Sequence, residues 1–279
     1  MAKKYKIDLK KDVEDKRDFK LTASPQKSYL VENSIVQIVD HSSQMSPVKD
    51  QGELGSCVAF SIAALKEWQE KKEYVFEKYV LGKEKERDYD KEYDFSEQWI
   101  YYNAKKLDPW PNEEGTSIRF GMKVLHKVGV PVEDGWQYND LDRGHPEKWA
   151  HLVARWNKIK AYYRIQTLNE LKHALIDSPV VMGFEIFEEI FDPGKSGIIP
   201  LPRNIRESWG GHCVCAVGFD DTRKLIKFKN SWSTEWGNNG YGYIPYEYIE
   251  RFGWDAWVAE DLRVTKAMLK GKQDEMFLY

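Results

Sequence analysis

The sequence predicts an α+β protein whose two lobes meet at a cleft. Apolar residues recur at helical spacing between about residues 50 and 165, whereas short β-branched or aromatic runs fill about residues 166–264. Helices followed by strands are typical of α+β folds, and the seam between two lobes is a common place for a ligand site. The 279 residues, 42% of them hydrophobic and 14% aromatic, are enough to build a packed core.

The first 34 residues are expected to form an arm in front of the globular part. They are polar and highly charged, and no amphipathic helical face is visible in them. We expect an extended segment or a short helix there. The globular domain then covers residues 35–264, with a helical lobe at about 50–165 and a β lobe at about 166–264, and residues 265–279 form a C-terminal tail.

Four helices are expected in chain order. The first begins after Ser56, behind a glycine-containing turn, and the second begins behind Ser96 as its N-cap. The third covers residues 117–127, with Gly129 at the position after its end where a left-handed residue is favoured. The fourth begins at Thr167, which forms a capping-box pair with the glutamate three residues later.

Short strands are expected in the second half, separated by clusters of Gly, Pro and Asn. They cover Val180–Phe187, His212–Phe219, Leu225–Lys229, Tyr241–Ile244 and Ala256–Val264. Between the first two helices, ten of the twelve residues from Lys83 to Asp94 are charged, which is typical of a solvated loop.

Charge and cysteine content exclude several classes of protein. The 42 Lys and Arg against 45 Asp and Glu give a net charge of −3, which argues against a nucleic-acid partner. Three cysteines argue against a disulfide-stapled scaffold and favour a reducing compartment. Met1–Lys20 carries no apolar signal segment, and Val58–Leu65 is too short to span a bilayer. We therefore expect a cytoplasmic protein with no membrane partner.

Cys57 is the first candidate for chemistry. It follows Ser56, a plausible N-cap, and would lie in the first turn of a helix, where the macrodipole and free N–H groups lower a thiol pKa. A buried structural cysteine is the alternative interpretation of an isolated thiol. The neighbouring motifs decide between the two.

Three different motifs follow one another along the chain. Gln51-Gly-Glu-Leu-Gly-Ser-Cys57 is followed by Gly211-His212 and later by Asn230-Ser-Trp232. Together they resemble the papain-like cysteine peptidases, in which a Gln precedes a Gly-Ser-Cys helix start and a His and an Asn-Ser-Trp follow. The separation of Cys57 and His212, 212 − 57 = 155 residues, is close to the roughly 130–150 typical of that layout.

The resemblance implies a role for each motif residue. Cys57 as thiolate would attack a peptide carbonyl, and His212 would pair with it and protonate the leaving amine. Asn230 would hydrogen-bond the far ring nitrogen of His212 and hold its orientation. The side chain of Gln51 would donate, with the Cys57 backbone N–H, to the developing oxyanion.

Weaker assignments also come from the resemblance. Trp232 would shield the His212–Asn230 pair, Trp236 would lie on the leaving-group side, and Gly115 would let a substrate backbone approach closely. The substrate-binding residues expected are Gly55, Ser56, Gly115, Gly211, Trp232 and Trp236.

Cys213 and Cys215 invite a metal interpretation that the pattern does not favour. Alternate residues of a strand face opposite sides, so His212 would point away from both thiols. No second ligand pair with zinc spacing is visible in the sequence. We expect two buried core thiols, no metal and no cofactor.

The sequence departs from the family pattern at a few positions. Leu54 stands where many secreted members have a disulfide cysteine, Val58 replaces a common tryptophan, and Ser233 replaces a common glycine. Asp15–Phe19 resembles the short leader of prokaryotic and viral relatives, so we hypothesise that the arm packs on the catalytic lobe or covers part of the cleft. An exopeptidase or transpeptidase on the same scaffold, with the C-terminal tail at one end of the cleft, and a catalytically silent binding or structural protein are the alternatives to an endopeptidase.

Overall fold

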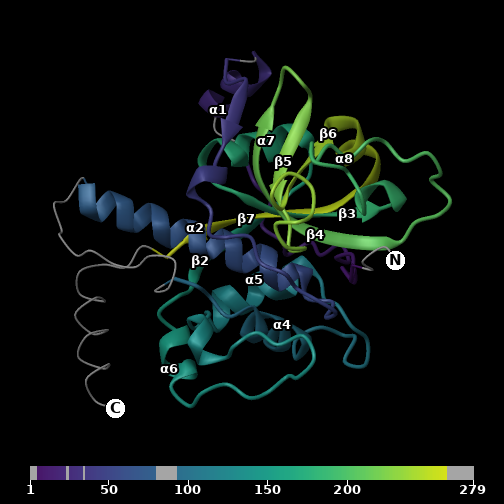
Figure 1. The fold of residues 1–279 in the computed structure, drawn as a ribbon. Coiled ribbons are helices and arrows are strands. Elements are labelled where there is room, and N and C mark those ends of the chain that lie inside the picture. The colour runs from purple at the N-terminus through teal and green to yellow at the C-terminus, as the bar shows by residue number, and fades with distance from the viewer. Residues whose placement is uncertain (1–4, 23–24, 34, 80–92, 263–279) are drawn as a thin grey trace.

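A computed structural model describes residues 5–22, 25–33, 35–79 and 93–262 (Figure 1). The helices are α1 (Pro25–Glu32), α2 (Cys57–Tyr79), α4 (Glu97–Lys105), α5 (Ile118–Lys127), α6 (Ala150–Ala154), α7 (Leu168–Asp177) and α8 (Tyr246–Phe252). The strands are β1 (Ile38–Asp40), β2 (Ile159–Ile165), β3 (Val180–Ile186), β4 (Gly210–Asp220), β5 (Leu225–Lys229), β6 (Tyr241–Pro245) and β7 (Gly253–Asp261). Residues 83–92 of the expected charged loop and the C-terminal tail lie outside the described residues.

The helical lobe is built around α2, which lies between the sheet and helices α4, α5 and α6 in Figure 1. The neighbouring helices α4 and α5 begin and end where the capping residues in the sequence predict. The Ser96 hydroxyl accepts a hydrogen bond from the Trp99 N–H at 3.1 Å and begins α4. Beyond α5, Gly129 adopts a φ of 84° and its N–H donates to the Val124 carbonyl at 2.9 Å.

The β lobe is one seven-stranded antiparallel sheet in the order β2-β7-β3-β4-β5-β6, with β1 added to β4. The five expected strands are present, and each end lies within three residues of its expected position. Strands β1 and β2 were not expected, because β1 has three residues and β2 buries only its two end positions, so neither has a clear alternating pattern. Strand β2 pairs with β7, so residues 159–165 belong to the sheet although the sequence groups them with the helical lobe.

Apolar residues pack on both faces of this sheet. One core joins α2, α4 and α5 to the inner face, which presents Val181, Cys215 and Trp257. The second core packs α7 and α8 on the other face, around Phe184 and Phe228. Because α2 lies directly against β4, the first residue of that helix meets the strand that carries His212 at the seam between the lobes.

Candidate active site

Cys57 is the first residue of α2 and is completely buried. Backbone N–H groups of Cys213 and Asp8 point at its thiol and act to lower its pKa. Because Cys213 directly follows His212 on β4, these contacts put the thiol beside the strand of the expected partner histidine.

His212 and Asn230 form a pair in the β lobe. The Nε2 atom of His212 lies 2.8 Å from Oδ1 of Asn230, and the Trp232 ring stacks on the imidazole at 4.3 Å between centroids. The remaining ring nitrogen, Nδ1, is buried and has no hydrogen-bond partner within the described part of the chain. One nitrogen is therefore fixed by an amide while the other is open to a reacting group.

The Gln51 side chain is fully buried and held in one orientation. Its Oε1 accepts a hydrogen bond from the Ser231 hydroxyl at 2.6 Å, so the amide nitrogen faces the other way. That nitrogen donates to the Leu54 carbonyl at 3.0 Å and to the Lys6 carbonyl of the arm at 3.3 Å. The amide is thus already donating to a peptide carbonyl oxygen in the cleft.

Burial opposes ionisation of both members of the expected thiol–imidazole pair. It raises the pKa of Cys57 to about 11, and it lowers the pKa of His212 to about 4. The position of Cys57 at a helix start predicts, by itself, a lowered thiol pKa. In this structure the loss of water outweighs the nearby N–H groups, so burial favours the neutral form of both groups.

The arm passes through the seam between the lobes. Tyr5 stacks on Trp232 at 4.4 Å between centroids, and the N–H of Leu9 donates to the Gly211 carbonyl at 3.0 Å. One residue later the arm donates to the Thr116 carbonyl at 3.0 Å. Leu9 is only 4% exposed and belongs to the inner core. The arm therefore excludes water from the residues that the motifs single out.

Gly115 lies where the arm backbone comes nearest to the helical lobe. It adopts a φ of 75°, and any side chain there would collide with the carbonyl group of Asp8. Gly55 faces the Asp8 side chain in the same way. Both positions lie against an extended peptide, which is the geometry that a peptide-binding cleft requires.

The other expected contact residues have different surroundings. Trp236 is buried, donates from its indole to the Ile190 carbonyl at 2.9 Å and meets the edge of Trp232, so it supports Trp232 from below. The Ser56 hydroxyl lies 2.7 Å from the Tyr138 hydroxyl. Gly211 packs closely on the Trp254 ring.

Two features bear on the metal question. Cys213 and Cys215 are buried in the inner core, as expected of structural thiols. Elsewhere among the described residues, oxygen atoms of Glu67, Asp94 and Glu97 lie within 4.8 Å of one another. The Lys49 ammonium contacts all three carboxylates, so a protein cation already occupies the centre of this acidic group.

Comparison with known proteins agrees with this geometry. Residues 34–253 match the papain family of cysteine proteases. The chain belongs to this family. It is 34% identical over 229 residues to an uncharacterised peptidase C1-like protein of Acanthamoeba polyphaga mimivirus, covering 76% of this chain and 69% of that one. It is 27% identical to cysteine proteinase 3 of Entamoeba histolytica, covering 73% of this chain and 60% of that one.

A solved papain-family structure covers nearly the whole chain. Xylellain, a cysteine protease from Xylella fastidiosa, has a TM-score of 0.76 and 30% identity, over 94% of this chain and 98% of that one. The Carica candamarcensis cysteine protease has a TM-score of 0.58 at 20% identity over 81% of this chain, which supports the shared fold. Within the part of the chain that the structure describes, no helix has the length and apolar character to cross a membrane.

Sequence reasoning missed several residues of this papain-family cleft. Tyr5 and Leu9 had a signal, because apolar and polar residues alternate strictly from Tyr5 to Lys10, as in a strand. Ser231, which donates a hydrogen bond to Gln51, lies inside the Asn230-Ser-Trp232 motif, where the sequence predicts roles only for Asn230 and Trp232. Phe191, which stacks with Tyr5 and Trp232, has no local signal, because only the fold brings it to the cleft.

Proposed function

We propose that this papain-family chain is a cysteine endopeptidase that uses Cys57, His212, Asn230 and Gln51, and that its own arm holds it inactive. The catalytic part rests above all on one observation. The Nε2 atom of His212 is hydrogen-bonded to Asn230, and its Nδ1 atom has no hydrogen-bond partner among the described residues. The next residue of the same strand, Cys213, contacts the Cys57 thiol through its backbone N–H.

The reaction follows from these positions. Cys57 transfers its proton to His212, and the thiolate attacks the carbonyl carbon of the peptide bond. Gln51 and the Cys57 backbone N–H donate to the oxygen as it becomes negative, as the Gln51 amide now donates to the Lys6 carbonyl. His212 then protonates the leaving amine, and water hydrolyses the acyl-enzyme. Asn230 keeps the imidazole oriented through both steps.

Inhibition by the arm is supported by its direction through the cleft. A leaving amine takes its proton from His212, so the substrate residues after the cleaved bond would lie toward Trp232. The residues before that bond would lie along Gly115. The arm runs the opposite way, from Tyr5 at Trp232 to Leu9 beyond Gly115, so its peptide bonds are presented in reverse.

The path of the arm also supports endopeptidase action. The described segment from Tyr5 to Lys10 runs along the cleft on both sides of the catalytic centre, from the Trp232 ring to the Thr116 carbonyl. A cleft that holds an internal segment of polypeptide suits cleavage within a chain. An exopeptidase would instead need a group that recognises a chain terminus.

An epoxide probe for reactive thiols tests the proposal. Full-length protein, a Leu9→Ala variant that weakens arm binding, and the same variant with Cys57→Ala are labelled and then mapped by mass spectrometry. Label on Cys57 in the Leu9→Ala chain, together with internal cleavage of a peptide library, is the expected result. Cys213→Ala in the Leu9→Ala chain serves as a matched control, because Cys213 is an inner-core thiol outside the expected catalytic set and labelling should not depend on it.

Three results would contradict the proposal. Labelling that persists after loss of Cys57 would assign the reactive thiol elsewhere. Folded Leu9→Ala protein that neither labels nor cleaves any peptide would favour a catalytically silent protein. Cleavage restricted to terminal residues of the library would replace the endopeptidase by an exopeptidase.

A further inference from the structure

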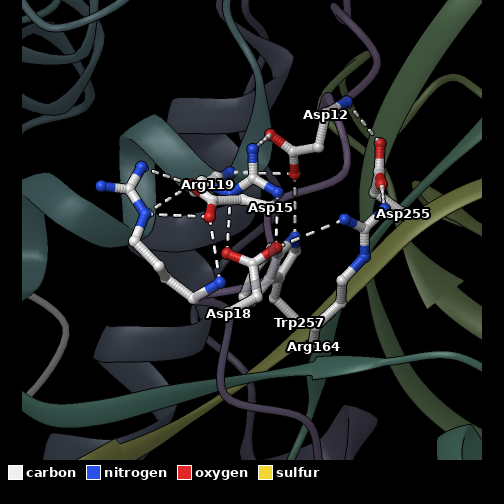
Figure 2. Close-up of polar contacts among 8 residues, drawn as sticks. Asp12, Asp15, Asp18, Arg119, Arg164, Asp255 and Trp257 are labelled. Carbon is white, nitrogen blue, oxygen red and sulfur yellow. Dashed lines mark hydrogen bonds and ion pairs between the residues drawn. The ribbon is translucent and has the colours of Figure 1, made fainter.

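Beyond Leu9 the arm meets a second group of charged residues, outside the catalytic centre (Figure 2). The Asp18 carboxylate accepts hydrogen bonds from Arg119 on α5, from Nε at 3.0 Å and from Nη2 at 2.5 Å. It also lies 3.4 Å from Nη1 of Arg164 on β2. A carboxylate that bridges two guanidinium groups forms one of the stronger polar contacts in proteins.

Asp12 is held by different donors of the same cluster. Its Oδ2 accepts from the Trp257 indole N–H at 2.9 Å and from the backbone N–H of Arg119 at 3.3 Å. Its own backbone N–H donates to the Asp255 carboxylate on β7 at 2.8 Å. The donors to Asp12 and Asp18 lie on α5, β2 and β7, which belong to the folded domain and not to the arm.

These donors are arranged around one buried ring. The guanidinium carbons of Arg119 and Arg164 lie 5.6 and 5.7 Å from the Trp257 ring centroid, within cation–π range. The Arg119 and Arg164 side chains are 11% and 16% exposed. The contacts of both guanidinium groups with Trp257, and of Arg164 with Asp255, do not involve the arm, so they hold the two groups near this ring before a ligand arrives and reduce the entropy cost of binding.

Departure of the arm would leave this cluster short of carboxylates. Among the described residues, the carboxylates that form ion pairs with the two arginines are Asp12 and Asp18 of the arm and Asp255 of β7, which stays behind. Two guanidinium groups and one carboxylate carry one net positive charge, and the Trp257 indole N–H loses its acceptor. Two guanidinium groups and an indole N–H that have lost charged acceptors can make charge-assisted hydrogen bonds to another carboxylate, so the site favours a replacement carboxylate.

We propose that Arg119, Arg164 and the Trp257 N–H form a carboxylate-binding site that the arm fills in the covered state and that acidic side chains of a protein substrate fill after the arm leaves. This inference rests on the proposed peptidase function. It names the class of substrate: chains with Asp or Glu before the cleaved bond.

The position of the acidic residue follows from the path of the arm. Asp12 lies three residues beyond Leu9, about 10 Å along an extended chain. A productive substrate runs in the opposite direction, so the residues before its cleaved bond approach this site. The acidic residue is therefore expected about three residues before the one that takes the place of Leu9.

A binding experiment on the full-length chain tests this inference without relying on catalysis. The protein carries Leu9→Ala, Asp12→Asn and Asp18→Asn to weaken the arm, and Cys57→Ala to prevent cleavage. Two fluorescent peptides, identical except for Glu or Gln at the expected position and its neighbours, are titrated by fluorescence anisotropy at low and at high salt. A second protein adds Arg119→Gln and Arg164→Gln, and thermal melting verifies that both are folded.

The Glu peptide is expected to bind at least tenfold more tightly than the Gln peptide at low salt. That ratio should fall toward one at high salt and in the protein without the two arginines. Equal dissociation constants for the two peptides would overturn the inference, and so would a Glu preference that survives loss of both arginines. Failure of the proposed peptidase function would appear separately, as absence of Cys57 labelling in the Leu9→Ala chain.

Discussion

Leu9→Ala should release the arm from the cleft and expose the Cys57 thiol. The Leu9 side chain is 4% exposed and packs into the inner core near Ile118 and Gly183. Its burial depends on the arm staying in place. Truncation removes apolar contacts that only the covered state has, so the equilibrium moves toward the open state.

The size of the effect follows from the buried area. Complete burial of a leucine side chain is worth about 2–3 kcal/mol, most of which is lost in alanine. Each 1.36 kcal/mol changes an equilibrium constant tenfold. The open fraction, and with it the rate at which a thiol probe labels Cys57, should therefore rise roughly 30- to 150-fold.

The assay is the second-order rate of probe labelling in wild type, Leu9→Ala and Val13→Ala. Val13 lies in the same arm but is 72% exposed, so its truncation should change the rate less than about twofold. Equal labelling rates for wild type and a folded Leu9→Ala protein would refute the claim that this contact holds the arm closed. A similar increase for Val13→Ala would show that the effect is unspecific.

Three further predictions concern catalysis and stability. Gln51→Ala in the Leu9→Ala chain should lower kcat about 100- to 1,000-fold in a peptide assay, because one oxyanion donor is lost; a kcat within threefold of the parent would remove Gln51 from that role. Burial, with the charge of Asp12, raises the pKa of Asp255 to about 6, so the folded state binds this proton more tightly than the unfolded state. That stabilisation is complete below about pH 4 and is lost as the pH rises through 6. The unfolding free energy of wild type relative to Asp255→Asn should therefore fall by up to about 3 kcal/mol between pH 4 and pH 7, and a constant difference would contradict the shift. Lys172→Met strands the buried Asp221 carboxylate, which lies 2.7 Å from the ammonium, and should cost roughly 3–5 kcal/mol in urea unfolding. Lys160→Met, which removes an exposed pair with Glu260, should cost under about 1 kcal/mol, and equal costs would show that burial is not the cause.

Local signals in the sequence predicted much of the fold. Ser96, Gly129 and Thr167 act at the helix ends expected of them, because caps depend on residues only three to five positions apart. Ser233 adopts a φ of 64°, a left-handed conformation that favours glycine, at the position where the resemblance leads us to expect a glycine. Strands β1 and β2 were missed because tertiary pairing, and not their own pattern, makes them strands.

For the candidate site, too, the sequence predicts the residues, whereas their environment depends on the tertiary structure. Motif order named Cys57, His212, Asn230 and Gln51, since each lies beside a distinctive local pattern. The ionisation of the pair could not be read from those motifs, because the burial that neutralises Cys57 and His212 comes from chain segments distant in sequence.

The sequence by itself determined which chemical groups this protein carries and, through short-range periodicity and capping, where most helices and strands begin. Only the tertiary structure decided that residues 5–10 lie in the cleft and that Asp12 and Asp18 meet Arg119 and Arg164, more than a hundred residues away. Such contacts depend on the matching of distant surfaces. A local pattern of residues contains no information about which surface will lie opposite.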